Sequence, residues 1–258
     1  MTAAHGNGNN GHTCVVMNTG GVKCWGINAY GQLGNGLTAS STVPVDVSGL
    51  GSGVSIVAAG SMHTCAVLAD GTGRCWGRND AGQLGNGLNT NSSVPVVIKG
   101  LTGIVALKAG GDNTSKMATC AVTGSGGLKC WGSNSDGQLG NGTTTASNVP
   151  VDVSGLTSSV VNVATGNRHT CATLSSGAVN CWGWNSNGQL GNGTTTNSSL
   201  PVSVHGFSTG NTAIATGYQH SCAITAQGSV KCWGGNGYGQ LGNSTTTQST
   251  TAVSVTGT

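Results

Sequence analysis

The chain contains no glutamate and little charge of either sign. Its 258 residues include nine lysines and arginines, six acidic residues that are all aspartate, and a single phenylalanine. Nucleic-acid-binding proteins usually carry a dense basic patch, which a dispersed net charge of +3 does not supply. The aspartates fall mostly in turns or edge strands and no catalytic set stands out. We therefore expect no enzyme activity, no catalytic residues and no nucleic-acid partner.

Two further patterns are missing. No run of about 20 apolar residues occurs, so we predict no membrane-spanning helix. The ten cysteines never form the closely spaced Cys-x-x-Cys pairs of zinc ribbons, so we expect no metal ligands and no cofactor. Glycine, serine, threonine and asparagine are abundant enough to suggest disorder, but the strict periodicity described next argues against it.

One unit recurs five times. Each copy carries the pair Cys-Trp, at spacings of 51, 55, 51 and 51 residues, and six residues after each Trp comes Gly-Gln-Leu-Gly-Asn. A period of about 50 residues is typical of propellers and solenoids, whose units stack because none buries its apolar face alone. We predict a single propeller domain over 1–258, with repeats at approximately 3–50, 51–101, 102–156, 157–206 and 207–258.

Each repeat reads as four short β-strands. In the second repeat we expect strands at 54–59, 63–68, 72–77 and 94–98, separated by turn residues, and no helical periodicity. Four strands repeated radially form a propeller blade. Proline suits an edge strand because it cannot donate to a ladder, so the last strand is predicted to be outermost. The prolines that mark this strand are Pro44, Pro95, Pro150 and Pro201, and the fifth repeat has Ala252 instead.

The repeated pattern His-Thr-Cys-Ala, then Cys-Trp-Gly-x-Asn-x-x-Gly-Gln-Leu-Gly-Asn-Gly, resembles the repeat of the regulator of chromosome condensation family, from about His12 to Asn243. The resemblance implies a β-propeller of four-stranded blades, usually seven. Five repeats leave two alternatives, a five-bladed ring or an arc of a larger seven-bladed ring. The founding member is a nucleotide-exchange factor that uses a projecting hairpin, whereas other members are secreted bacterial proteins. Here the only insertion is four residues within 110–119, which disfavours exchange activity.

Two cysteines stand ten residues apart in every repeat, with a turn between them. Folding the hairpin about that turn places them opposite each other, within reach of a disulfide. The alternative is ten free, buried thiols that pack as small apolar residues. Disulfides would place the protein outside the reducing cytosol, so we predict that it is secreted or at the cell surface. The predicted pairs are Cys14 with Cys24, Cys65 with Cys75, Cys120 with Cys130, Cys171 with Cys181, and Cys222 with Cys232.

Other recurrent positions are candidates for structure or binding. A histidine two residues before the first Cys, as in His63, is expected to be buried and hydrogen-bonded in each repeat that has one; the third has Ala118. The unrepeated Trp184 is a candidate contact residue or an extra packing residue. A basic residue before the second Cys either packs its stem on the Trp or contributes to a cationic face for an acidic partner. These basic residues are Lys23, Arg74, Lys129 and Lys231.

These observations predict a non-enzymatic binding or structural module. It would present a propeller face to a protein partner, or self-associate through the open ends of an incomplete ring. One alternative is a carbohydrate-binding, lectin-like module, because polar tracts such as 143–148, 194–199 and 244–250 suit hydrogen bonding to sugar hydroxyls. The other alternative is a nucleotide-exchange regulator of a small GTPase.

Overall fold

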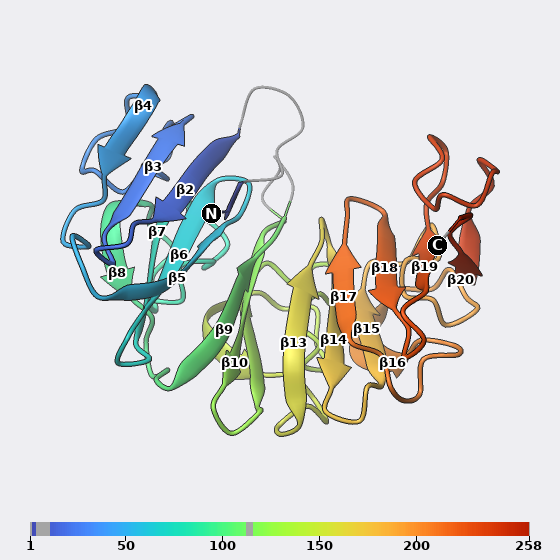
Figure 1. Cartoon of the computed structure of the whole chain (residues 1–258). Helices are drawn as coiled ribbons and strands as arrows, with labels where there is room; N and C mark the ends of the chain where they lie inside the picture. Colours follow the sequence, from blue (N-terminus) through green and yellow to red (C-terminus); the bar gives the residue numbers. More distant parts are fainter. Residues whose placement is uncertain (1, 4–10, 112–115, 258) are drawn as a thin grey trace. The chain divides into compact units, whose positions relative to one another are not determined.

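The computed structural model describes residues 2–3, 11–111 and 116–257 (Figure 1). Within these ranges all regular structure is β, in five four-stranded sheets, and no helix is long and apolar enough to cross a membrane. Each sheet follows the chain order of its strands and pairs them antiparallel. The predicted four-stranded unit is therefore present five times. The insertion predicted within 110–119 lies partly outside the described residues.

The strands of the first three sheets are as follows. The first sheet contains β1 (Thr2–Ala3), β2 (His12–Val16), β3 (Val22–Gly26) and β4 (Ser41–Asp46). The second contains β5 (Val54–Ala59), β6 (His63–Leu68), β7 (Gly73–Gly77) and β8 (Ser92–Val97). The third contains β9 (Ile104–Ala109), β10 (Ala118–Thr123), β11 (Leu128–Gly132) and β12 (Ser147–Asp152).

The last two sheets repeat this pattern. The fourth contains β13 (Val160–Thr165), β14 (His169–Leu174), β15 (Val179–Gly183) and β16 (Ser198–Ser203). The fifth contains β17 (Ala213–Thr216), β18 (His220–Ile224), β19 (Val230–Gly234) and β20 (Ser249–Ser254). In the second repeat β5 and β6 have the predicted bounds. Strand β8 begins two residues before its predicted start because Ser92 pairs with Gly77 across a register shift.

The chain divides into two compact units. The first comprises 1–124, 129–133 and 146–151, and the second comprises 125–128, 134–145 and 152–258. In the first unit the loop leucine Leu33 and the tryptophan Trp76 of the following repeat are fully buried in one apolar cluster. In the second unit Leu190 and Trp233 are likewise buried in one apolar cluster. The ring centroids of Phe207 and Trp233 lie 5.3 Å apart. That 1–258 form one domain stays a prediction.

All ten cysteines form disulfides inside the hairpins made by the second and third strands. Cys65 lies opposite Cys75 in the ladder of β6 and β7, with 4.0 Å between their Cα atoms. The other four pairs have the same ten-residue separation and Cα distances of 4.0–4.1 Å. The predicted pairing is therefore present in every repeat. Nine of the ten cysteines are buried, and Cys222 is half-buried.

A buried asparagine organises the Gly-rich loop of each repeat. In the second repeat Asn79 Nδ2 donates to the carbonyl oxygens of Leu88 (2.9 Å) and Thr90 (3.0 Å). Its Oδ1 accepts the Leu84 amide at 2.9 Å, which holds the leucine in the core. The glutamine Gln83 accepts the Ala81 amide at 3.0 Å with its side chain, as expected of a residue that satisfies backbone groups.

Candidate functional site: the joints between repeats

Adjacent repeats within each unit meet at a shared carbonyl oxygen. In the first unit Gln32 O accepts the Trp76 Nε1–H at 2.9 Å and the Thr64 hydroxyl at 2.8 Å. A loop carbonyl thus orients both a tryptophan and a threonine of the next repeat, and we call this arrangement a joint. The other joints use Gln83 with Trp131 and Thr119, Gln138 with Trp182 and Thr170, and Gln189 with Trp233 and Ser221.

A neutral histidine extends three of the joints. His12 Nε2 lies 2.6 Å from Thr64 Oγ1, and because that hydroxyl donates to Gln32 O, its oxygen accepts the proton on Nε2. His63 bonds Thr119 and His169 bonds Ser221 in the same way, both at 2.9 Å. The prediction of a buried, hydrogen-bonded histidine is thus confirmed in these three repeats.

These histidines are held in their uncharged form. Burial lowers the pKa of His12 to about 4 and, with a smaller contribution from a neighbouring histidine, the pKa of His63 and His169 to about 3. Their Nδ1 atoms are buried without a partner. Within the described ranges no three His, Cys or Asp side chains gather as a metal site.

Three variable positions surround the constant part of each joint. The first position belongs to one repeat and is five residues after its Trp, as in Tyr30. The other two positions belong to the next repeat: one directly precedes the histidine position, as in Met62, and the other is two residues after the Trp, as in Arg78. The last two are tied by a backbone hydrogen bond, as from Arg78 N to Met62 O at 2.9 Å. We call these three residues the joint triad. The triads are Tyr30, Met62 and Arg78; Ala81, Met117 and Ser133; Asp136, Arg168 and Trp184; and Asn187, Gln219 and Gly235.

In the first unit, one triad places an arginine on an aromatic ring. The Arg78 guanidinium carbon lies 5.0 Å from the Tyr30 ring centroid, and Nη1 lies 3.2 Å from Met62 Sδ. Arg78 Nη2 also pairs with Asp80 Oδ2 at 2.6 Å. The cation is therefore fixed at three points, and Tyr30 stays partly exposed beside it.

In the second unit, another triad also places an arginine on an aromatic ring, but the arginine and the aromatic residue stand at different triad positions. The Arg168 guanidinium carbon lies 5.2 Å from the Trp184 ring centroid, and Nη1 lies 4.0 Å from Asp136 Oδ2. Trp184 is half-buried, whereas Trp182 of the same repeat is completely buried. An aromatic ring, a guanidinium and a carboxylate thus share one partly exposed patch.

The predicted basic residues occupy equivalent positions on the third strand of four sheets, and all are half-buried. Lys23 lies opposite Asp46 across β3 and β4, and its Nζ is 2.7 Å from Asp46 Oδ1. Arg74 lies opposite Ala66 and Val97, with its Nε buried and without a partner. Lys231 lies opposite Ala223 and Ser254, and Lys129 has the same place on β11. Their role in binding stays a prediction.

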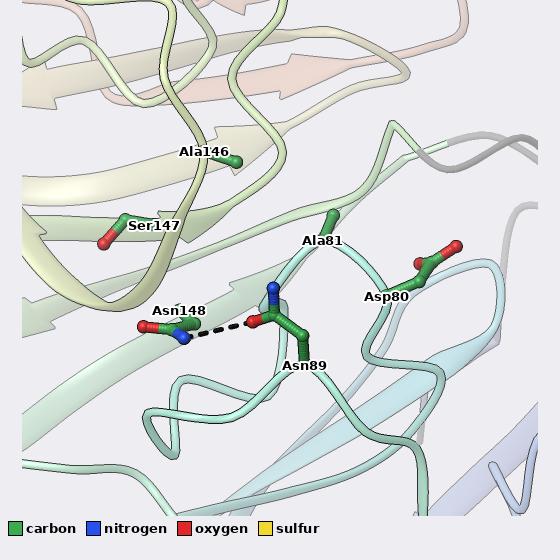
Figure 2. A pocket seen from close by; sticks show the side chains of 6 residues that line it. All are labelled: Asp80, Ala81, Asn89, Ala146, Ser147 and Asn148. Atoms are coloured by element: carbon green, nitrogen blue, oxygen red, sulfur yellow. Dashed lines mark hydrogen bonds between the residues drawn. The ribbon is translucent and has the colours of Figure 1, made fainter.

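A polar pocket of about 260 Å³ opens in the first unit, where the triad residue is the small Ala81. Figure 2 shows Asn89 and Asn148 pointing toward one another, with Asn148 Nδ2 donating to Asn89 Oδ1 at 3.1 Å. Asp80 and Ala81 lie on the same loop, and Ala146 and Ser147 complete the wall. The pocket therefore combines amide and carboxylate groups with two small methyl surfaces.

Family models match most of the chain. One described as the regulator of chromosome condensation (RCC1) repeat matches residues 19–67, 75–115, 125–173 and 176–224. A second with the same description matches residues 54–83, 104–138, 160–189 and 212–240. The chain belongs to the RCC1 repeat family. The resemblance predicted from its motifs is confirmed.

Proteins with RCC1 repeats from distant organisms resemble the chain. The ultraviolet-B receptor UVR8 of Arabidopsis thaliana is 35% identical over 90% of this chain and 53% of the receptor. The human E3 ubiquitin-protein ligase HERC2 is 31% identical over 91% of this chain and 5% of the ligase. The chain thus spans about half the length of the receptor and a small part of the ligase, so the likeness concerns the repeats and not the activities of those whole proteins.

Two solved structures share the RCC1-type fold. Human WBSCR16 superposes with a TM-score of 0.81 at 26% identity, over 95% of this chain and 65% of that one. Yeast RCC1 (Prp20), in a crystal structure with Kap60 bound, gives 0.82 at 19% identity, over 97% of this chain and 60% of that one. The predicted all-β propeller of four-stranded sheets is confirmed.

The residues that form the joints were only partly visible in the sequence. The repeated His, Trp, Gln and Leu stood out by their spacing, but the Thr64 hydroxyl that links His12 to Gln32 did not. The joint triads did not stand out as sets of residues. Aligning the five repeats column by column would have marked the triads as variable columns within a constant frame.

Proposed function

We propose that the chain is a non-enzymatic binding module, secreted or at the cell surface, that recognises a protein partner through its joint triads. The observation that carries the proposal is the arginine fixed on a partly exposed aromatic ring in two triads, at Arg78 with Tyr30 and at Arg168 with Trp184. Arginine, tyrosine and tryptophan are the residues that most often dominate protein-binding energy.

The hydrogen-bonded loops around the triads favour recognition of a partner without a large rearrangement of the loop backbone. The joint hydrogen bonds and the buried asparagines hold the loops in place, so a partner meets side chains that are already ordered. Variable residues on a constant frame are also how repeat proteins build binding surfaces. The five disulfides support a location outside the reducing cytosol.

The test compares triad variants with matched substitutions elsewhere. Cross-linking to surface and secreted proteins of the source organism would supply a partner, whose affinity is then measured with purified proteins. We expect Arg78→Ala or Trp184→Ala to weaken binding about tenfold or more. The exposed controls Lys108→Ala and Val161→Ala should leave the affinity unchanged. If both triad variants bind the partner as the unmodified chain does, the triads are not the recognition site.

The polar pocket supports a second candidate, a carbohydrate-binding module. Asn89 and Asn148 offer amide donors and acceptors, and Asp80 adds a carboxylate, which together match the hydroxyls of a sugar (Figure 2). The volume of about 260 Å³ suits one sugar ring rather than a long chain.

Glycan-array screening would test this candidate. We expect Asn89→Ala and Asn148→Ala to abolish any signal, and the exposed turn variant Asn18→Ala to retain it. An array with no signal above background would reject the carbohydrate reading and leave the protein-binding proposal untouched.

A further inference from the structure

Six asparagines in the described residues are followed directly by glycine, the sequence that deamidates most readily in water because glycine has no side chain to hinder the reaction. The glycine nitrogen attacks the asparagine Cγ, and the side-chain nitrogen leaves as ammonia with the proton that the attacking nitrogen loses. Water then opens the resulting cyclic succinimide to aspartate or isoaspartate. The net reaction consumes one water, releases one ammonia and needs no oxidant or enzyme. The six asparagines are Asn35, Asn86, Asn141, Asn187, Asn192 and Asn236.

In four of these pairs the glycine nitrogen that would attack is hydrogen-bonded to the next repeat. Gly36 N donates to Ser93 O at 3.0 Å, so the nitrogen keeps its proton and its orientation while this bond lasts. The attack requires the nitrogen to lose that proton, and the bond therefore prevents it. The equivalent bonds run from Gly87 to Asn148 at 2.8 Å, and from Gly142 to Ser199 and Gly193 to Thr250 at 2.9 Å.

The asparagine side chain that would be attacked is held in the same loops. Asn35 Oδ1 accepts the Leu37 amide at 3.2 Å and the Asn28 Nδ2–H at 3.4 Å. These bonds restrict the rotation of the carboxamide that ring closure requires. Both reacting groups are therefore restrained while the loop is folded. The same two bonds are made by Asn86, Asn141 and Asn192.

The bond from each of these glycines to the next repeat belongs to a joint. In the first joint Gln32 O, four residues before Gly36 in the same loop, accepts the Trp76 Nε1–H at 2.9 Å. Gly31 also lies against Ser93, since a Cβ on it would meet Ser93 Cα at 2.5 Å. Because one short loop makes all these contacts, the Gly36 amide is released when the joint opens locally. Each joint that opens therefore exposes one Asn-Gly pair to reaction.

We propose that Asn35, Asn86, Asn141 and Asn192 are deamidation sites that react only when their own joint is open. Isoaspartate adds a methylene to the backbone directly before the glycine, which displaces the glycine amide from its acceptor carbonyl in the next repeat. Each conversion also adds one negative charge to a chain of net charge +3. An opening that leads to isoaspartate therefore weakens that one joint permanently. The proposal does not depend on the triads, so it stands or falls separately from the proposed function.

Asn187 provides an internal comparison, because its glycine is not bound across a joint. Gly188 N donates to Asn185 O at 2.9 Å, within the same loop. The protection of Asn187 should therefore be independent of the joints that protect Asn35 and Asn141. A variant that loosens one of those two joints should change the reaction at one asparagine and leave Asn187 as it was.

Peptide mapping by mass spectrometry after incubation at mildly alkaline pH tests the proposal. Trp76→Phe removes a hydrogen bond from the first joint, and Trp182→Phe removes the equivalent bond from the third. We expect the first variant to speed deamidation at Asn35 and the second at Asn141, each about fivefold for the loss of one hydrogen bond, with Asn187 unchanged in both. Equal acceleration at all three sites, or no acceleration at the predicted ones, would overturn the proposal.

Hydrogen exchange on the unmodified chain covers the case in which the tryptophan variants do not fold. The open fraction of the first joint follows from the exchange of the Gly36 amide. We expect the deamidation rate of Asn35 in the folded chain, divided by its rate in the unfolded and reduced chain, to match that open fraction within about threefold. Equal rates in the folded and unfolded chains, or a ratio far from the open fraction in either direction, would contradict the requirement for an open joint.

Discussion

The buried histidines show how single residues set the conditions under which the repeats hold together. His63 Nε2 donates to Thr119, whose hydroxyl donates in turn to Gln83 O, while the buried Nδ1 has no partner, so a proton added at Nδ1 would place an uncompensated charge in the interior. Gly60 leaves room for the ring, because a Cβ there would meet His63 Cε1 at 2.5 Å. The three joints that contain a histidine are therefore sensitive to protonation.

Stability should therefore fall in mild acid. The folded pKa of His12, about 4, and those of His63 and His169, about 3, lie below the ordinary 6.5, so the folded state binds fewer protons than the unfolded chain between these values. The stabilisation is complete above about pH 6.5 and declines with acid, by up to about 1.4 kcal/mol per pH unit for each histidine. Denaturant titrations between about pH 7 and pH 5 measure this slope.

Two variants separate these histidines from other titrating groups. His63→Ala, which creates the residue that the third repeat has at Ala118, should reduce the slope by roughly a quarter to a third, because burial also lowers the pKa of His220. The exposed His205→Asn should leave it unchanged. With six aspartates and no glutamate, few carboxylates compete in this pH range. A free energy of unfolding that stays constant from neutral pH to about pH 5 would contradict the prediction.

The glycines of the loops offer a second test at this scale. A Cβ on Gly85 would lie 2.6 Å from Trp131 Nε1, and its φ of 68° is already unfavourable for other residues. Gly242 has a similar φ of 59° but no tryptophan above it. We expect Gly85→Ala to cost about 1–3 kcal/mol more than Gly242→Ala in the free energy of unfolding. Equal costs would show that backbone strain alone determines both effects.

At the scale of the element, the outermost strand of each sheet limits its own pairing. In β8, Ser92 Oγ donates to Val94 O at 2.7 Å and also accepts the Val94 amide. The strand thus satisfies some of its own backbone hydrogen-bonding groups. Pro95 then removes the next donor, and the same serine-and-proline order occurs in β4, β12 and β16. Such devices discourage pairing between sheet edges.

Strand β20 has the serine but carries Ala252 in place of the proline. Because four equivalent strands accept proline, Ala252→Pro should be tolerated and should raise the free energy of unfolding by about 0.4–1 kcal/mol, by restricting the unfolded chain. Thermal unfolding measures the change. As a control, Val253→Pro should destabilise the protein strongly, because Val253 pairs with Cys232 in the ladder. Equal damage from both variants would show that β20 differs from the other four strands.

At the scale of the whole molecule, the disulfide in every sheet is the feature that supports the proposed location outside the reducing cytosol. Alkylation in denaturant, followed by intact mass, should modify none of the ten cysteines until reductant is added, and all ten afterwards. Denaturant removes the protection that burial alone would give. Each disulfide closes a short loop and adds at most about 3 kcal/mol, so reduction should also lower the melting temperature. Ten modified cysteines without reductant would reject the extracellular location.

The sequence by itself determined the repeats, the strands and which cysteines face each other. Cys65 and Cys75 are ten residues apart across one turn, and β5 and β6 follow from short apolar runs between turn residues. These features depend on local chain geometry, in which period and turn position decide which residues face each other. The glutamines and tryptophans of the joints could be recognised as residues of the fold because they recur at the same place in every repeat.

Only the tertiary structure decided which distant residues meet. Tyr30 and Arg78 belong to different repeats, and no local rule places a guanidinium on that ring. The ion pair of Lys23 with Asp46 could not be seen in the sequence either, because the register between β3 and β4 places the two residues opposite each other. Such contacts depend on the stacking of one repeat on the next and on register shifts between strands. Both are set by long-range packing rather than by the spacing of residues along the chain.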